Sequence, residues 1–328
     1  PSIRIITRLI AVALREAETR LAPRHVKCTG RLTWLTFVDF CTHIGRLPYQ
    51  GYLDDSVIIC AKRRRVMIDF LIIGAQRGGT QSFYDYLLQH PSVVPAIQPD
   101  LHFFDQHYDR GLAWYISQFP LLAGYYGAKR PEGCITGEAS PFYFHHPLVA
   151  ERIRLHCPNA KLIVLLRNPT DRAYSHFRQA VRLGKEQFSF SMALKVEAKR
   201  MEKGMQRLRD NPELYAERNL FNSYISHGLY AQQIKRWKSV FPEQQLLFVR
   251  SEEYFSDPVS HVLQAYRFLG LTPFSPRVMD PPPVHEFEFL TDQTREKIDK
   301  VFKHSNEETF RLLNWSQSWT NQLDARLK

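Results

Sequence analysis

Hydrophobic positions along the chain alternate between short continuous apolar runs and longer segments at helical spacing. Continuous runs, typical of strands buried on both faces, occur at Phe70–Ile73, Lys161–Leu166 and Leu246–Val249. Segments with helical apolar spacing surround them, at about 79–90, 147–156, 170–184, 189–209, 223–240, 257–269 and 291–313. Strands that alternate with helices predict an α/β fold, a single domain with a central parallel sheet flanked by helices.

The segment before this pattern has weak periodicity and is predicted to be a separate, partly helical N-terminal extension over residues 1–66. Its start, "IRIITRLIAVALREAETRL", has the spacing of a basic amphipathic helix. Such a helix can make a weak contact with a membrane surface or pack on the domain, and both interpretations stay open. No run reaches the roughly 18 apolar residues of a membrane span. We expect the main domain over 67–316 and a C-terminal tail over 317–328.

The net charge limits the classes of partner to expect, and the cysteine content indicates the redox state of the compartment. The net charge of +11 favours an anionic partner, such as a nucleotide or an acidic glycan. The cysteines have no C-x-x-C spacing, so they predict neither a zinc site nor a disulfide framework. A reducing, cytoplasmic location is therefore expected from the five positions Cys28, Cys41, Cys60, Cys134 and Cys157.

A glycine loop follows the first predicted strand, in "FLIIGAQRGGTQSFYDYLL". A strand, a glycine loop and a helix N-terminus together form a site for an anion. Gly74 and Gly79 have the separation of a nucleotide-binding P-loop, but Thr80 and Gln81 stand where Lys and Ser or Thr are needed. A cation, Arg77, lies inside the loop instead. This P-loop-like loop suits one phosphate and a neighbouring charged group, and it is poorly equipped for a metal-bridged triphosphate.

The second predicted strand ends on another set of anion-binding residues, in "AKLIVLLRNPTDRAYSHF". Arg167 stands where the strand should end, and Asn168-Pro169 should start a helix. Ser175 follows about one turn into that helix. Ligands of parallel sheets bind outside the carboxyl ends of the strands, so Arg167 and Ser175 can converge on a second phosphate.

Four ordered motifs resemble those of sulfotransferases that use 3′-phosphoadenosine 5′-phosphosulfate: "GAQRGGTQSFYDYL", "HFFDQHYDRGLAWYISQFP", "GEASPFYFHHP" and "LIVLLRNPTDRAYSHF". The likeness is strongest to bacterial relatives of the heparan sulfate glucosamine 3-O-sulfotransferases and covers Asp69 to Trp315. It implies that the first loop grips the 5′-phosphosulfate and that an Arg…Ser pair grips the 3′-phosphate. The resemblance gives the first role to Arg77, Gly78, Gly79, Thr80 and Gln81, and the second to Arg167 and Ser175.

The predicted chemistry needs a base but no metal. A sulfuryl group in transfer carries less charge than a phosphoryl group, so cationic donors such as Arg77 can stabilise its transition state alone. The acceptor hydroxyl must lose its proton to a base. Relatives read Lys-Glu-x-His-Phe-Phe where this chain has Pro99-Asp100 before Leu-His-Phe-Phe. We predict Asp100 as the base, with His102 as its rival or as a group that orients the acceptor.

The predicted function is therefore sulfuryl transfer to an acceptor hydroxyl, on a glycan or another small molecule, with no nucleic acid partner. The heparan enzymes carry Lys where Ala139 stands, so the acceptor stays open. One alternative is a catalytically weak or silent nucleotide-binding protein, which would keep the two grips. Another is a P-loop-like nucleotide kinase, which would need the missing lysine and Mg²⁺. The charged segment Lys195–Asp210 is predicted to be a solvated helix face, with an acceptor groove as the alternative.

Overall fold

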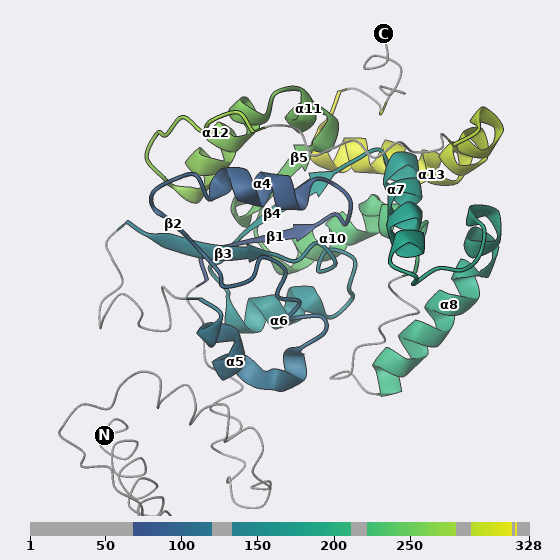
Figure 1. The fold of residues 1–328 in the computed structure, drawn as a ribbon, viewed down its shortest axis with the longest axis horizontal. Coiled ribbons are helices and arrows are strands. Elements are labelled where there is room, and N and C mark those ends of the chain that lie inside the picture. The colour runs from purple at the N-terminus through teal and green to yellow at the C-terminus, as the bar shows by residue number, and fades with distance from the viewer. Residues whose placement is uncertain (1–67, 120–132, 211–221, 280–289, 317–318, 320–328) are drawn as a thin grey trace, which may run out of the picture. The chain divides into compact units, whose positions relative to one another are not determined.

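The computed structural model describes residues 68–119, 133–210, 222–279 and 290–316, together with residue 319 (Figure 1). The predicted extension over 1–66, with its amphipathic helix, lies outside the described residues. Of the predicted tail over 317–328, only Trp319 is described.

The described residues contain one parallel sheet of five strands, in the order β2-β3-β1-β4-β5 (Figure 1). The predicted α/β fold with a central parallel sheet is confirmed. The strand β2, which is only three residues long, was not predicted from the apolar pattern. The strands are β1 (Phe70–Gly74), β2 (Val93–Pro95), β3 (Ile135–Ala139), β4 (Lys161–Leu166) and β5 (Leu246–Arg250).

Helices cover both faces of the sheet. Figure 1 shows α4, α11 and α12 on one face and α5, α6 and α10 on the other. The helices α7, α8 and α13 lie to the right of the sheet in Figure 1. Their bounds are α4 (Thr80–Leu87), α5 (Gly111–Ser117), α6 (Val149–His156), α7 (Pro169–Arg182), α8 (Phe190–Asp210), α10 (Tyr230–Val240), α11 (Ser251–Ser256), α12 (Pro258–Leu269) and α13 (Asp292–Leu313).

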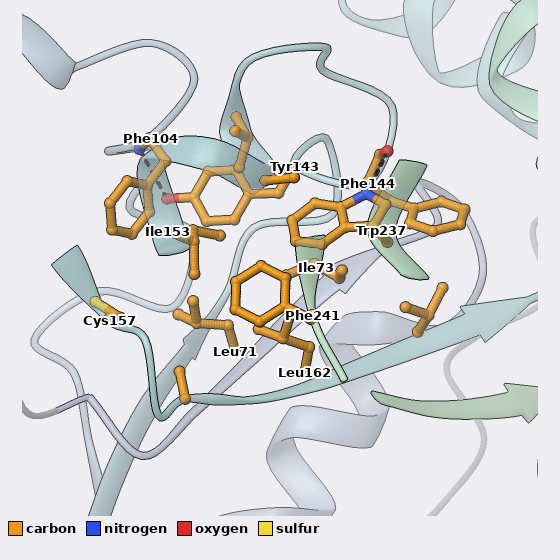
Figure 2. Packing of buried hydrophobic residues seen from close by; sticks show 14 of the residues in the cluster. Leu71, Ile73, Phe104, Tyr143, Phe144, Ile153, Cys157, Leu162, Trp237 and Phe241 are labelled. Atoms are coloured by element: carbon orange, nitrogen blue, oxygen red, sulfur yellow. Dashed lines mark hydrogen bonds between the residues drawn. The ribbon is translucent and has the colours of Figure 1, made fainter. Parts of the chain in front are cut away.

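Side chains of the central strands alternate between two hydrophobic clusters, as the two-residue period of a strand requires. Leu71 and Ile73 of β1 point into a cluster with α5, α6 and α10 (Figure 2). Phe70 and Ile72 point into the opposite cluster, with α4 and α12. Trp237 of α10 anchors the first cluster. Both faces of β1 are therefore buried, which explains its continuous apolar run.

The sheet has a topological switch point between β1 and β4, its two central strands. From β1 the chain continues to β2 on one side of the sheet, and from β4 it reaches β5 on the other. The strands pair in parallel, with Phe70 opposite Lys161. The loops that leave β1 and β4 therefore lie side by side at one edge, which is where ligands bind in such sheets.

The helix predicted over 223–240 begins only at Tyr230. The backbone N–H groups of Tyr224, Ile225 and Ser226 donate to the Glu197 carboxylate, at 2.9, 2.9 and 2.8 Å. These donors are held by a side chain of α8 instead of by backbone carbonyls of their own helix. Residues 226–228 consequently form a 3₁₀ turn.

Candidate active site

The loop between β1 and α4 is held close to its neighbours, and its two glycines make this possible. A Cβ on Gly78 would lie 2.7 Å from the carbonyl oxygen of Leu165. Gly79 adopts a φ of 92°, and a Cβ there would lie 2.8 Å from the Phe255 ring. The Ser251 hydroxyl donates to the Gly78 carbonyl at 2.8 Å. Any larger residue at either position would force the loop away from β4 and α11.

The first turn of α4 offers backbone donors to a ligand. Within the described part of the chain, the N–H groups of Gly79, Thr80 and Gln81 make no hydrogen bond. The Thr80 side chain is buried, and the Gln81 amide donates to Asp85 along the helix at 2.9 Å. Thr80 and Gln81 therefore present their backbone N–H groups, and not their side chains, to a ligand at the positive end of the helix dipole.

The two predicted anion grips, which are the loop residues 77–81 and the pair Arg167 and Ser175, are in contact. Arg77, in the first loop, donates from Nε to the Ser175 hydroxyl of α7 at 3.0 Å. Arg167, just after β4, donates from Nη1 to the Arg77 carbonyl at 3.5 Å. Asn168 fixes this junction by capping α7, since its side chain accepts from the N–H groups of Thr170 and Asp171. Residues from two separate strand exits thus form one contiguous site.

This site is strongly cationic. The pKa of Arg77 is lowered by burial and then by the nearby Arg167, Arg182 and Arg172. Among the described residues, none of Arg77, Arg167 and Arg172 forms an ion pair with a carboxylate. Like charges held close together destabilise one another. An anion bound here would relieve that repulsion.

Arg172 is the cation that sequence reasoning missed. It is fully buried on α7, and burial lowers its pKa. Its guanidinium donates to the Tyr224 carbonyl and, at 3.5 Å, to the Gln76 carbonyl. The Arg172 Nε and the Gln76 Oε1 are buried without a hydrogen-bond partner. The unpartnered N–H at the Arg172 Nε fits a ligand that bears acceptor oxygen atoms, whereas the Gln76 oxygen would need a donor. In the sequence, Arg172 was marked only as another arginine shortly after Arg167, in the helix that follows that residue.

The two predicted base candidates are in direct contact. His102 lies between two carboxylates, with Nδ1 at 2.7 Å from Asp105 and Nε2 at 3.2 Å from Asp100. Burial alone would lower the pKa of His102, but the charges and hydrogen bonds of Asp105 and Asp100 outweigh it and raise the pKa well above its usual value. The two carboxylates therefore favour the protonated form of His102. The Asp105 side chain is fully buried, whereas that of Asp100 is 49% exposed.

A buried acid, Glu138 of β3, supports this group and was not predicted as a site residue. Its carboxylate accepts from the hydroxyls of Ser140 at 2.6 Å and of Tyr115 and Tyr143 at 2.9 Å. Burial raises its pKa to about 7, although the hydroxyl donors act in the opposite direction. The Ser140 hydroxyl in turn accepts from the backbone N–H of His102 at 2.9 Å. The available signal was an acid and a hydroxyl two residues apart, on one face of a strand.

The base candidates and the cationic site lie on neighbouring strands. Pro99 accepts from the Ala139 N–H at the end of β3, at 3.1 Å. The Phe144 N–H donates to Ile73 at the end of β1, at 2.7 Å. No hydrogen bond or ion pair between described residues joins Asp100 or His102 to Arg77. The base candidates and the cationic site therefore lie at the same end of neighbouring strands and are not joined by a hydrogen bond or an ion pair.

Within the described residues, no group of three or more His, Cys, Asp or Glu side chains is placed to hold a metal ion.

Comparisons with known proteins agree with this geometry. The Sulfotransferase domain family matches residues 67–325. Human heparan sulfate glucosamine 3-O-sulfotransferase 6 is 34% identical over 209 residues, which are 63% of this chain and 54% of that protein. The chain thus spans about half the length of this curated relative. The solved structure of a sulfotransferase from Alicyclobacillus acidocaldarius has 28% identity and a TM-score of 0.59, covering 77% of this chain and 98% of that one.

The predicted cytoplasmic location is wrong by the same comparisons. A Dictyostelium discoideum relative, 25% identical over 319 residues (77% of this chain and 66% of that protein), is a membrane-associated sulfotransferase. Cysteine spacing reports at most on redox conditions, so it could not by itself identify the compartment. In the described ranges, no helix has the length and apolarity to cross a membrane.

Proposed function

The chain belongs to the sulfotransferase family, and from that membership we propose that it transfers a sulfuryl group from 3′-phosphoadenosine 5′-phosphosulfate to an acceptor hydroxyl. The observation that carries the proposal is the contact between the two anion grips, made by Arg77 and Ser175 at 3.0 Å. A nucleotide with a 5′-phosphosulfate and a 3′-phosphate presents two anionic groups, and this site joins two anion-suited strand exits.

The donor would be held by backbone and guanidinium groups. Arg77, Gly78 and the N–H groups of Gly79–Gln81 would bind the phosphosulfate, and Arg167 and Ser175 would bind the 3′-phosphate. The unpartnered Nε of Arg172 supports this assignment, because a further buried donor faces no protein acceptor. When bound, the donor supplies an activated sulfuryl group. Arg77 would then stabilise the charge that develops as the group departs.

We assign the base to Asp100 and an orienting role to His102. A protonated imidazole is a hydrogen-bond donor, and it can take up no second proton. His102, whose pKa is raised by its two carboxylates, would therefore orient Asp100 instead of acting as the base. The half-exposed Asp100 carboxylate can be reached by an acceptor hydroxyl. The acceptor proton would go to Asp100 as the acceptor oxygen bonds to sulfur and the bond from sulfur to the 5′-phosphate oxygen breaks, so that adenosine 3′,5′-bisphosphate leaves.

A saccharide hydroxyl is the acceptor that the relatives support. Human 3-O-sulfotransferase 6 and a bovine bifunctional N-deacetylase/N-sulfotransferase, 30% identical over 217 residues (62% of this chain and 22% of that protein), both carry heparan sulfate in their names. The deciding experiment is transfer of labelled sulfate from the donor across a panel of glycans, lipids and phenols. Label on a glycan hydroxyl supports the proposal, and label on phenols alone contradicts the acceptor class.

Donor recognition can be tested without any acceptor. Adenosine 3′,5′-bisphosphate should raise the melting temperature far more than AMP or ATP, with no metal added, because ligands that bind only the folded state stabilise it. Arg167→Ala should remove most of the preference for the 3′-phosphate. Equal stabilisation by ATP, or a strict Mg²⁺ requirement, contradicts the proposed donor.

A further inference from the structure

The turn between α7 and α8 concentrates exposed hydrophobic side chains. Eight large hydrophobic side chains are exposed in the described part of the chain, and four of them fall between residues 181 and 192. Exposed hydrophobic residues are ordinarily scattered singly, and a cluster marks an interaction site. We call this cluster the α7–α8 tip; its members are Val181 (45% exposed), Leu183 (54%), Phe188 (46%) and Met192 (47%).

Cations surround the tip, and its acids are turned inward. Exposed cations stand at Arg182, Lys185, Lys195 and Lys199. The acidic residues between 181 and 201 are Glu186 and Glu197, and both are buried, at 4% and 5% exposure. This fully described stretch therefore shows solvent apolar and cationic groups but no carboxylate.

The buried acids also fix the shape of the tip. Glu186 forms a bidentate ion pair with Arg200 at 2.6 and 3.1 Å and accepts from the Phe188 N–H at 3.1 Å. The Arg200 guanidinium lies 5.3 Å from the centre of the Phe188 ring. Glu197 holds α8 to residues 224–226. A tip anchored in this way presents its side chains with little entropy left to lose on binding.

The apolar and cationic groups share one face of α8. Met192, Lys195 and Lys199 have the spacing i, i+3 and i+7, which places them along one side of a helix. Ala193 and Glu197 lie on the buried side. An apolar band bordered by cations is the pattern of a helix at a membrane interface.

We propose that the α7–α8 tip docks on an anionic lipid bilayer, with its apolar side chains at the boundary of headgroups and acyl chains. Lys195 and Lys199 would then face acidic headgroups. A soluble polyanion would engage the cations but leave Leu183 and Met192 exposed to water, so the lipid surface accounts for more of the tip. This docking determines where the protein works and is independent of which group it transfers.

The test is co-sedimentation of the full chain with phosphatidylcholine vesicles, with and without phosphatidylserine. The parent should bind the phosphatidylserine vesicles, and salt should weaken this binding. Lys195→Gln/Lys199→Gln should weaken it about 30-fold, at about 1 kcal/mol per cation. Leu183→Ser/Met192→Ser should weaken it at least about tenfold, because buried apolar groups are lost.

Matched substitutions on α13 provide the controls. Val301→Ser replaces a hydrophobic side chain that is 55% exposed, and Lys297→Gln/Lys303→Gln removes two exposed cations; both should bind vesicles as the parent does. All variants should melt at the parent temperature and keep sulfuryl transfer to a soluble acceptor. The proposal is overturned if the parent ignores the vesicles or if the tip and control variants bind equally. It is also overturned if the tip variants lose binding to heparin but not to lipid.

Discussion

At the residue scale, Ser140 connects a buried acid to the proposed base. Its hydroxyl donates to Glu138 and accepts from the His102 N–H, and His102 has a left-handed φ of 49°. Such a conformation is unfavourable for a residue with a Cβ, so outside contacts must hold it. Glu138 therefore influences the position of Asp100 through a series of contacts. Glu138 holds the Ser140 hydroxyl, that hydroxyl holds the backbone of His102, and the His102 ring contacts Asp100.

Replacing Ser140 should separate positioning from binding. In Ser140→Ala the backbone N–H of His102 loses its acceptor, so His102 and the Asp100 carboxylate that it contacts should shift. This small displacement of the base should lower turnover about 10- to 100-fold. The Kd for adenosine 3′,5′-bisphosphate should stay within about twofold, because the cationic site lies elsewhere on the sheet edge. Ser140→Thr keeps the hydroxyl and should restore turnover. If both variants behave alike, or if the Kd rises as turnover falls, the positioning role is wrong.

Asp100 and His102 are separated by their own substitutions. Asp100→Asn should lower turnover by at least about 10²-fold, the usual contribution of a general base, with the bisphosphate Kd nearly unchanged. Asp100→Glu keeps the carboxylate on a longer arm and should preserve activity. If His102→Ala is the more severe change and Asp100→Asn is nearly silent, His102 is the base. Single-turnover transfer at saturating donor measures both.

Some residues of the site could be predicted from the sequence because their position along the chain, after a strand end, places them at the site. Arg77, Arg167 and Ser175 follow strand ends, and parallel strands bring their carboxyl ends to one edge. The contacts of His102 could not be predicted, since they depend on a left-handed backbone and on Ser140, which is distant in the chain. Glu138 likewise becomes a supporting residue only when Tyr115, far from it in sequence, closes over it.

At the element scale, α8 shows how tertiary contacts assign charged residues to different roles. Its sequence predicts a solvated face, and Lys195, Lys199 and Lys203 are indeed exposed. Glu197, in the same run, is buried and accepts three backbone N–H groups. Alternating charges in a sequence cannot reveal this difference, because the donors to Glu197 lie on a separate segment of the chain.

Removing the Glu197 charge should loosen α8 from the domain. Glu197→Gln replaces a carboxylate that accepts three bonds with an amide that has one acceptor oxygen, so buried N–H groups would lose partners. Hydrogen bonds to a charged group contribute roughly 1.5–3 kcal/mol, and we expect the free energy of unfolding to fall by about that much. Glu202→Gln, on the exposed side of α8, is the matched control and should change it by less than about 0.5 kcal/mol. Equal losses in urea unfolding would contradict the anchoring role.

At the scale of the whole molecule, histidines packed beside arginines should contribute to the pH dependence of stability in acid. Burial, followed by neighbouring arginines, lowers the pKa of His145 and His176 well below the usual value and that of His146 to about 3. The unfolded chain would bind protons at these positions from about pH 6.5 downward, whereas the folded chain would not. Their stabilisation is therefore fully present above pH 6.5 and is lost as the pH falls. Glu138, whose pKa is raised to about 7, has the opposite pH dependence, since it favours the folded state more in acid.

His102 and Glu252, whose pKa values are also raised, act in the same direction as Glu138, so the pH dependence of the parent is a balance between two opposing sets of groups. Each of the three histidines with a lowered pKa should contribute up to about 1.4 kcal/mol per pH unit to the slope of the free energy of unfolding between pH 6.5 and pH 5. His146→Gln removes one of these titrations while keeping an acceptor for the Leu148 N–H, so its slope should be shallower by about that amount. His304→Gln, at an exposed position of α13, should leave the slope unchanged. Urea unfolding at a series of pH values measures all three proteins. Parallel pH dependences for the parent and His146→Gln would show that the His146 ring is protonated or solvated in the folded protein.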